Sequence, residues 1–492
     1  MKKHFALFPF LIIILFVFIF TNVSASPDYA GTINTALLDT LITEQMAKHG
    51  LPGVALAVIE NNQVIYQKGY GIDGNGDPMT PQTKVFIGSQ SKSFTALAIA
   101  RLVELGKIDL NSSVQTYIPW FKVADEQASG EITINHLLHH TSGLSDAGYG
   151  VVLPLDTSLE DAVRSLAKAK LTAPVGTKFQ YFNMGYTVLA YLIEMQSGQS
   201  YADFISQNIL SPLGMESSTA NPANANAMPR GYTRLFGFSV PAKEGYQLYG
   251  VGAGWIVSNA EDMAKYAIEF QTNKTQLVSN AMMRRILTPG IGSYGMGWFI
   301  YDGGSKIIHG GANQTFRTEV NIYPKSNRAF VLLTNQGYQI DHFISAGQLT
   351  ASVEAVVLGH TPPLAREGWS VRWIGWSIGL LVLGLCILHT HNFLSLRGWR
   401  ERVAKLSPAK RIWDIAISFL IPIIITTVIF WQVSQFYGTR FNLISSVAYL
   451  RQSMPDIFIL MLIGTLPDLI QGIIKVILWK HKGVEPAAET EE

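Results

Sequence analysis

The sequence predicts an α+β domain followed by three transmembrane helices. Within residues 30–355, strand-like segments lie near both ends and helical patterns lie between them, which indicates one sheet built from both ends of the domain. Beyond this segment, three apolar runs are each close to the roughly 20 residues needed to cross a bilayer. The 492 residues are enough for one large core and these additional segments.

Residues 1–25 are predicted to form a secretory signal peptide. Two lysines precede an uncharged apolar run over 5–20, and Val23-Ser24-Ala25 fits a small-residue cleavage site. An uncleaved anchor helix is the alternative, because the run is long for a signal peptide. In both cases the residues that follow are expected to be exported.

Turn and cap residues mark the elements expected in the exported domain. Asn61-Asn62 predicts a tight hairpin, and Gly50 and Gly106 each close a helical pattern. The expected elements are helices over 37–49 and 94–105, and strand pairs over 54–59 with 64–67 and over 318–323 with 329–334.

Three apolar runs in the C-terminal third are predicted to be transmembrane helices. They cover 371–389, 412–433 and 456–479, after a linker at 356–370 and before a tail at 480–492. Core helices of a soluble domain are the alternative, but three such runs with tryptophans at their ends favour a membrane. Asp468 lies in the third run, where an acid is costly; it is either functional or paired with Lys475 or another polar neighbour.

Loop charge predicts the orientation of these helices. Only Arg440 and Arg451 lie between the second and third runs, and a larger basic group lies between the first two. That group consists of Arg397, Arg400, Arg402, Lys405, Lys410 and Arg411. Basic loops stay in the cytoplasm. We therefore expect a multi-pass cell-membrane protein with its large domain on the extracytoplasmic side and its C-terminus in the cytoplasm.

Composition excludes several classes of function. The formal net charge of +2 gives no preference for nucleic acid. Cys386 is the only cysteine, which excludes an intramolecular disulfide and a cysteine-based metal site. No cofactor or metal is predicted. The expected partners are the membrane and a small substrate, and the oligomeric state, including a homodimer, stays open.

A serine followed three residues later by a lysine places a hydroxyl and an amine on one helix face. A buried lysine that loses its proton can activate such a serine as a nucleophile. Ser89 opens an apolar helix, whose positive end favours an alkoxide, although a capping role is the alternative. Ser407 lies in the predicted cytoplasmic loop, and Ser165 lies on a charged helix expected to be a solvated face. The pattern occurs at Ser89/Lys92, Ser165/Lys168 and Ser407/Lys410.

Tyr181-Phe182-Asn183 is a second candidate motif. It is either a loop before a helix or a part of the site. In the second interpretation, Tyr181 relays a proton to the leaving group and Asn183 hydrogen-bonds a substrate amide. A tyrosinate would need a nearby cation, such as Lys92, to lower a pKa of about 10.

His309-Gly310-Gly311 is the third candidate motif, and it precedes the final predicted hairpin. It is either a turn or an edge strand that binds substrate through its main chain, because glycines allow another backbone to approach closely. In the second interpretation, the amide of Ala312 joins that of Ser89 in an oxyanion hole.

These motifs, in this order, resemble the β-lactamases and penicillin-binding proteins, whose pattern is Ser-x-x-Lys, a middle motif and Lys-Thr-Gly. The Tyr-x-Asn and His-x-Gly forms resemble the class C β-lactamase-like branch, peptidase family S12. Similar stretches begin at His140 (His-Thr-Ser-Gly-Leu), Gly252 (Gly-Ala-Gly-Trp) and Ser258 (Ser-Asn-Ala-Glu-Asp-Met). His309 replaces the lysine, which argues against efficient β-lactam hydrolysis because a permanent cation for the drug's carboxylate is missing.

The resemblance implies a fold and a mechanism. The fold is an antiparallel sheet flanked by helices, with an all-helical subdomain. In the mechanism, Ser89 loses its proton through Lys92 and Tyr181 and attacks a carbonyl. Water then releases the acyl-enzyme.

The three spans after the exported domain resemble the colibactin-activating peptidases, which remove an N-acyl-D-amino-acid cap from an exported natural product. This implies a D-stereospecific serine peptidase that acts on a small peptide or an acylated natural product. The main alternative is a cell-wall enzyme, either a D-Ala-D-Ala carboxypeptidase or a D-alanyl esterase. A non-catalytic membrane ligand sensor is an alternative from another class, against which the complete motif set argues.

Overall fold

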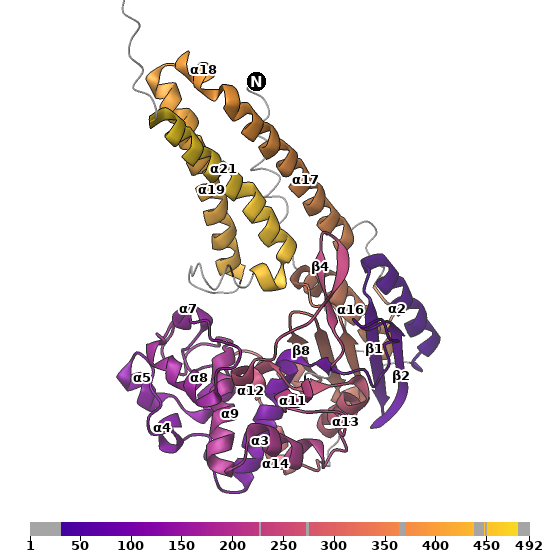
Figure 1. Ribbon diagram of the computed structural model, residues 1–492. Helices are drawn as coiled ribbons and strands as arrows, with labels where there is room; N and C mark the ends of the chain where they lie inside the picture. Colours follow the sequence, from indigo (N-terminus) through magenta and orange to yellow (C-terminus); the bar gives the residue numbers. More distant parts are fainter. Residues whose placement is uncertain are drawn as a thin grey trace, which may run out of the picture.

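The computed structural model describes residues 31–480 except 226–227, 272–274, 364–369, 437–446 and 448–449. Figure 1 shows a rounded α+β domain from which a bundle of long helices projects. The two-part organisation predicted from the sequence is therefore confirmed. The predicted signal peptide and the tail beyond residue 480 lie outside the described residues.

A six-stranded antiparallel sheet forms the centre of the α+β domain, in the order β2-β1-β10-β9-β8-β7. β1 pairs with β10 from Val54 opposite Thr334 to Glu60 opposite Arg328. The prediction of one sheet built from both ends of the domain is confirmed. The strands are β1 (Gly53–Glu60), β2 (Gln63–Gly71), β7 (Phe299–Tyr301), β8 (Lys306–Ala312), β9 (Arg317–Tyr323) and β10 (Arg328–Thr334).

The turn between β1 and β2 has the backbone that its asparagines predict. Asn61 and Asn62 have φ angles of 53° and 61°. Positive φ at both central residues is typical of the type I′ turn, whose twist matches that of the flanking strands, and asparagine tolerates it well.

Both faces of the sheet are covered by helices. α2 (Thr35–His49) and α16 (Gly347–Val357) pack on one face, and α13 (Ala260–Gln271) packs on the other against β1, β9 and β10. Alternate residues of β1 therefore enter two different cores. Val54, Leu56 and Val58 join the cluster with α2 and α16, whereas Ala55, Ala57 and Ile59 join the larger cluster.

A helical lobe lies beside the sheet, as the resemblance implied (Figure 1). Its longest helix, α9, packs against α3, which carries Lys92. The lobe contains α4 (Val114–Tyr117), α5 (Glu126–Glu131), α6 (Ile134–Leu138), α7 (Asp146–Tyr149), α8 (Leu159–Ser165), α9 (Asn183–Ser197) and α10 (Tyr201–Ile205). Further elements of the α+β domain are α3 (Ser91–Glu104), α11 (Pro222–Ala225), α12 (Val251–Gly254), α14 (Asn280–Ile286), α15 (Gln339–Asp341), β3 (Val85–Phe86) and β6 (Val257–Ser258).

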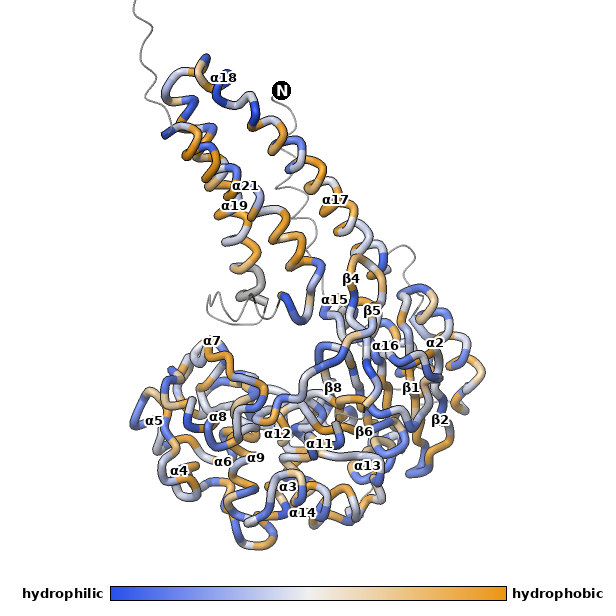
Figure 2. The backbone as a smooth tube through the Cα atoms, in the orientation of Figure 1, coloured by the Kyte–Doolittle hydropathy of each residue, from blue (hydrophilic) through white to orange (hydrophobic). Residues whose placement is uncertain are grey.

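Three described helices are long and apolar enough to cross a membrane, over Val371–Ala404, Pro408–Trp431 and Pro455–Lys480. Figure 2 shows the apolar residues that run along them. Each is longer than the predicted run, because the helical backbone continues into flanking polar residues. They are built from α17 (Val371–Ser395), α18 (Trp399–Ala404), α19 (Pro408–Phe436) and α21 (Pro455–Lys480).

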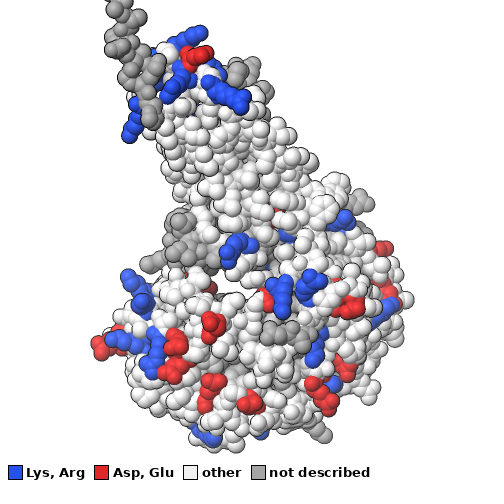
Figure 3. Space-filling model, in the orientation of Figure 1, with Lys and Arg blue, Asp and Glu red and all other residues white. Residues whose placement is uncertain are grey.

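Charge is concentrated at the end of the helix bundle that lies farthest from the sheet. Figure 3 shows lysine and arginine side chains there and few charges along the bundle surface. This end includes α18, with Arg400 and Arg402. The pattern agrees with the basic loop on which the topology was based, and the sidedness stays a prediction.

Asp468 does not pair with Lys475, as one interpretation of the sequence expected. Its Oδ1 lies 3.4 Å from Nδ1 of His389 on α17, whereas Lys475 Nζ lies 2.9 Å from Asp414 Oδ2 on α19. Asp468 and Lys475 therefore contact two different neighbouring helices. The contact with His389 corresponds to the other interpretation, in which Asp468 meets a polar neighbour inside the bundle.

A hairpin formed by β4 (Gly231–Leu235) and β5 (Phe238–Ala242) lies where the α+β domain meets the helices. A Cβ on Gly375 of α17 would lie 2.1 Å from the Gly237 nitrogen, so the two backbones are in direct contact. Nearby, the Tyr338 hydroxyl donates a 2.8 Å hydrogen bond to Asp456 Oδ1 at the start of α21, and both side chains are buried.

A buried ion pair stabilises this junction. Arg234 donates from Nε to Asp341 Oδ2 at 2.9 Å and from Nη2 to Oδ1 at 3.0 Å, and both side chains are almost fully buried. We expect Asp341→Asn to lower the free energy of unfolding by about 3–5 kcal/mol, because it leaves a buried guanidinium without its counter-charge. Thermal unfolding of the full chain in detergent measures this. The double variant Arg234→Met/Asp341→Leu should be much less damaging, and an equal loss in both would contradict the explanation.

Candidate active site

Ser89 and Lys92 meet as the sequence predicts. Ser89 lies in a single 3₁₀ turn, η1 (Gly88–Gln90), directly before α3, rather than inside the α-helix. Lys92 Nζ lies 3.1 Å from Ser89 Oγ. Ser89 is half-buried, and Lys92 is completely buried. The hydroxyl is thus reachable, while the amine is withdrawn from water.

The surroundings of Lys92 favour its neutral form. Burial lowers the pKa of Lys92 well below its usual value, and the negative charge of Asp146 only partly opposes this. The Ala253 carbonyl accepts a 2.6 Å hydrogen bond from Nζ and so fixes the amine. A neutral amine held in this way can accept the proton of Ser89.

Tyr181 also reaches Ser89. The two hydroxyl groups are hydrogen-bonded, and Lys92 Nζ lies 4.8 Å from the centre of the Tyr181 ring. Burial raises the pKa of Tyr181 above its usual value, so the phenol keeps its proton at neutral pH. Tyr181 is therefore suited to donate a proton, and Lys92 to accept one.

Close backbone contacts place β8 beside Ser89. A Cβ on Gly311 would lie 1.9 Å from the Ile87 carbonyl oxygen, and a Cβ on Gly88 would lie 2.3 Å from the Ala312 nitrogen. Gly88 also has a φ of 55°, which favours glycine. The amide nitrogen of Ala312 is thus next to the turn that carries Ser89, as the predicted oxyanion hole requires.

We expect Gly311→Ala to reduce kcat/KM by about 100-fold, because the added methyl group would push β8 away from Ile87 and shift the Ala312 amide. Hydrolysis of a chromogenic ester by the purified full chain measures this. Gly130→Ala is the matched control, since the nearest atom to its new Cβ, Gln115 Oε1, is 3.6 Å away. Unchanged hydrolysis by Gly311→Ala would show that the contact with Ile87 does not position the site.

His309 is buried and has a polar partner that the sequence analysis missed. Its Nε2 lies 3.1 Å from the Tyr294 hydroxyl, and its Nδ1 lies 2.7 Å from the Gly310 carbonyl oxygen. These partners imply that Nδ1 carries the proton and that Nε2 accepts from Tyr294. Burial, with the charge of Lys92, lowers the pKa of His309 to about 3, so the ring is neutral at neutral pH.

Two further polar side chains, Asn183 and Asp146, bear on the candidate site. Asn183, predicted to bind a substrate amide, is exposed as the first residue of α9. Asp146 was not predicted; it acts electrostatically on Lys92 and Tyr181, and the surrounding protein raises the pKa of its carboxyl to about 6. Only its position directly after the His-Thr-Ser-Gly-Leu stretch could have drawn attention to it.

The stretches that carried the family resemblance support the site without reaching substrate. His140 Nδ1 accepts a 3.1 Å hydrogen bond from the Phe182 amide and so fixes the Tyr-x-Asn loop. The Gly-Ala-Gly-Trp stretch supplies the Ala253 carbonyl to Lys92 and the Gly254 carbonyl to the Asn313 side chain. In the third stretch, Asn259 accepts from the Asp262 amide at the start of α13, which is a structural role.

The second match to the serine–lysine pattern forms no comparable site. Ser165 Oγ is hydrogen-bonded to the Tyr149 hydroxyl at 2.6 Å and to the Ala162 carbonyl, and Lys168 is exposed. The expectation of a purely solvated face was wrong for Ser165 itself, which is half-buried because it packs against α7.

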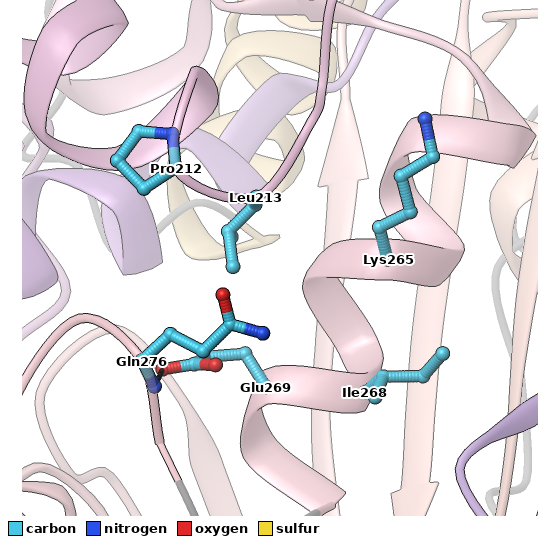
Figure 4. Close-up of a pocket in the computed structure, with 6 residues that line it drawn as sticks. All are labelled: Pro212, Leu213, Lys265, Ile268, Glu269 and Gln276. Atoms are coloured by element: carbon cyan, nitrogen blue, oxygen red, sulfur yellow. Dashed lines mark hydrogen bonds between the residues drawn. The ribbon is translucent and has the colours of Figure 1, made fainter.

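A hollow of about 240 Å³ lies away from these residues, between α13 and the chain that follows α10 (Figure 4). Its carboxylate, Glu269, already accepts from the amides of Gln276 and Leu277, and Lys265 contacts Asp262. Among the described residues, no group of three or more His, Cys, Asp or Glu side chains could hold a metal ion.

Comparisons with known proteins agree with the fold and with the family that the sequence resembles. Residues 38–355 match the family described as Beta-lactamase. "Protein flp" of Staphylococcus aureus strain MW2 is 29% identical over 311 residues, which cover 61% of this chain and 62% of that protein. "Unguisins hydrolase ungD'" of Aspergillus campestris is 28% identical over 334 residues, with the same coverage of 61% and 62%. The chain thus spans less than two thirds of the length of these curated relatives.

Solved structures show the same fold. An octameric penicillin-binding protein homologue from Pyrococcus abyssi superposes with a TM-score of 0.60 at 28% identity, covering 68% of this chain and 79% of that one. EstCE1, a hydrolase with promiscuous acyltransferase activity, gives a TM-score of 0.58 at 20% identity, covering 66% of this chain and 98% of that one, and supports the fold alone. From its matched residues, its sheet and its helical lobe, the chain belongs to the Beta-lactamase family.

Proposed function

We propose that the protein is a membrane-anchored serine hydrolase that forms an acyl-enzyme on Ser89 and acts on D-amino-acid-containing peptides. The observation that carries this proposal is the contact of Ser89 with both Lys92 and Tyr181, beside the amide of Ala312. The three apolar helices that follow support an anchored enzyme. The basic loop between the first two spans is the reason for proposing that the α+β domain lies on the extracytoplasmic side.

The proposed mechanism divides the proton transfers between two residues. Lys92 takes the proton of Ser89 as Oγ attacks the substrate carbonyl, and the amides of Ser89 and Ala312 stabilise the oxyanion. Tyr181 gives its proton to the leaving group and regains one from Lys92. Water then attacks the acyl-enzyme, and the same groups transfer a proton from this water to Ser89 Oγ as the acyl–oxygen bond breaks.

The charges around the site favour a substrate without a free carboxylate near His309. The neutral ring of His309 offers no cation for such a group. This supports removal of an N-acyl-D-amino-acid cap, with an amine as leaving group, over D-Ala-D-Ala carboxypeptidase activity. One relative is named as a hydrolase of unguisins, and this name supports a small-molecule substrate.

A D-alanyl ester is the second candidate, and the Asp146 carboxylate favours it. Such an ester carries an ammonium group next to the scissile carbonyl, and an opposite charge within a few ångströms stabilises it. Of the two cell-wall activities considered, the D-alanyl esterase therefore remains a candidate.

Turnover of matched substrates tests the proposal. We expect the purified full chain to cleave an N-acyl-D-asparaginyl amide at least tenfold faster than D-Ala-D-Ala, and to leave the L-asparaginyl epimer intact. Equal cleavage of both epimers would contradict D-stereospecificity. Ligand binding without any turnover would instead favour the non-catalytic sensor.

A further inference from the structure

A second hollow, of about 330 Å³, lies on the face of the sheet that points away from Ser89. On β8 and β9, Gly311 and Thr318 face the Ser89 turn, where the Thr318 hydroxyl donates to the Ile87 carbonyl. Their neighbours point to the other face, towards α16, because side chains alternate along a strand. The hollow is lined by Lys306, Ile308, Glu319, Asn321, Gly347, Thr350, Ala351 and Glu354.

Two polar groups in this hollow have no hydrogen-bond partner in the described part of the chain. Asn321 is only 2% exposed, yet no atom accepts from its Nδ2. The Glu319 carboxylate is half-buried and has no hydrogen-bond partner among the described residues, and burial raises its pKa to about 7. Buried donors are nearly always paired in proteins, so Asn321 Nδ2 calls for a bound acceptor, and the half-buried Glu319 carboxylate can take a donor from the same molecule.

The hollow of Figure 4 provides a contrast. There, Glu269 is already satisfied by two backbone amides, so its polar groups do not call for a ligand. In the hollow behind β8, Lys306 and Glu354 form an ion pair with each other, which leaves Glu319 and Asn321 as the groups without partners.

Glu319 and Asn321 have complementary needs. The first offers an acceptor that is open to a donor, and the second presents a buried donor that requires an acceptor. They occupy alternate positions of β9, about 7 Å apart along the strand and on the same face. A molecule that satisfies both must carry an N–H donor and an oxygen acceptor a few bonds apart.

We propose that this hollow binds a small zwitterion of the free amino-acid class, with its ammonium group on Glu319 and its carboxylate on Asn321 Nδ2. The Lys306 ammonium lies on the same wall and favours the carboxylate, while Glu354 balances its charge. Ile308 and Ala351 provide apolar surface for a short side chain. The site does not depend on which substrate Ser89 accepts.

The hollow lies directly behind the strand that borders the active site. A Cβ on Gly310 would lie 2.8 Å from Glu319 Oε1, so the carboxylate rests against the backbone of the His-Gly-Gly motif. Binding at Glu319 would therefore occur one strand away from the Ala312 amide. Gly310 is needed here to leave room for a carboxylate, whereas Gly311 is needed for the contact with Ile87.

Ligand-detected NMR with the full chain in detergent tests the site. We expect saturable binding of alanine, with propionate and ethylamine each binding at least tenfold more weakly because each lacks one of the two groups. Asn321→Leu and the isosteric Glu319→Gln should each weaken alanine binding at least tenfold. Gln276→Leu, in the hollow of Figure 4, is the matched control and should leave binding unchanged.

The Ser89→Ala variant separates this site from the active site. It should bind alanine as strongly as the unmodified protein does. Thermal unfolding shows whether each variant is folded. If Asn321→Leu is not folded, the test relies on Glu319→Gln. The proposal is overturned if alanine does not bind saturably, if propionate or ethylamine binds equally well, or if Glu319→Gln keeps the original affinity. Because no turnover is measured, these outcomes are independent of the proposed function.

Discussion

Ser89→Ala is expected to abolish covalent labelling by a fluorophosphonate probe and to lower kcat by about a thousandfold or more. Its Oγ contacts both the Lys92 amine and the Tyr181 hydroxyl. Removing the nucleophile from a set of groups that act together costs nearly all of their combined effect. Labelling of the purified full chain, resolved by mass spectrometry of the modified peptide, measures this directly.

Ser165→Ala is the matched control for this prediction. It carries the same spacing to a lysine, but its hydroxyl is engaged by Tyr149 and Lys168 is exposed. We expect its labelling and turnover to equal those of the unmodified protein. Labelling that persists in Ser89→Ala would remove Ser89 as the nucleophile and with it the proposed mechanism.

The main parts of the fold could be predicted because their signals are local. The Asn61-Asn62 turn, the cap at Gly50 and the apolar lengths of the three final helices each depend on a short stretch of sequence. The pairing of β1 with β10 was also predictable, because strand signals stood at both ends of one exported segment. The β4–β5 hairpin was missed, since it is short and its contacts lie with helices more than a hundred residues later in the chain.

In the candidate site, too, local contacts could be predicted from the sequence and tertiary contacts could not. Ser89 and Lys92 are three residues apart on one helical path, so their contact followed from spacing. Tyr294 and the Ala253 carbonyl could not be identified in this way, because only the tertiary fold brings them to His309 and Lys92. The sequence allowed Asp468 to meet Lys475 or another polar neighbour in the bundle, and only helix packing shows that this neighbour is His389.

The roles of Tyr181 and Lys92 required the structure most of all. The sequence allowed either residue to remove the proton of Ser89. Burial shifts the two pKa values in opposite directions, upward for Tyr181 and downward for Lys92, since it disfavours the charged form of each. The pKa directions therefore favour Lys92 as the base in the proposed mechanism, and this assignment can be tested.

Both Lys92→Met and Lys92→Arg are expected to lower the rate of Ser89 acylation by about a thousandfold. Methionine has a similar length but no amine, and arginine keeps a positive charge but does not give up its proton in proteins. If Lys92 acted only as a fixed cation, the arginine variant would retain most of the activity. A rate for Lys92→Arg within tenfold of the unmodified protein would therefore contradict the assignment of Lys92 as the base.

The pH dependence gives the same argument a second measurement. Because burial lowers the pKa of Lys92, its neutral form increases as the pH rises through that lowered value, and the acylation rate should rise with it. This rise of the acylation rate with pH should be absent in Lys92→Met and Lys92→Arg. Lys168→Met, which changes an exposed lysine, should keep it. Thermal unfolding confirms that the larger arginine is accommodated. If the acylation rate of Lys92→Met still rose with pH in the same way, the rise would be due to the titration of another group. Asp146, whose pKa is raised to about 6, would then be the candidate.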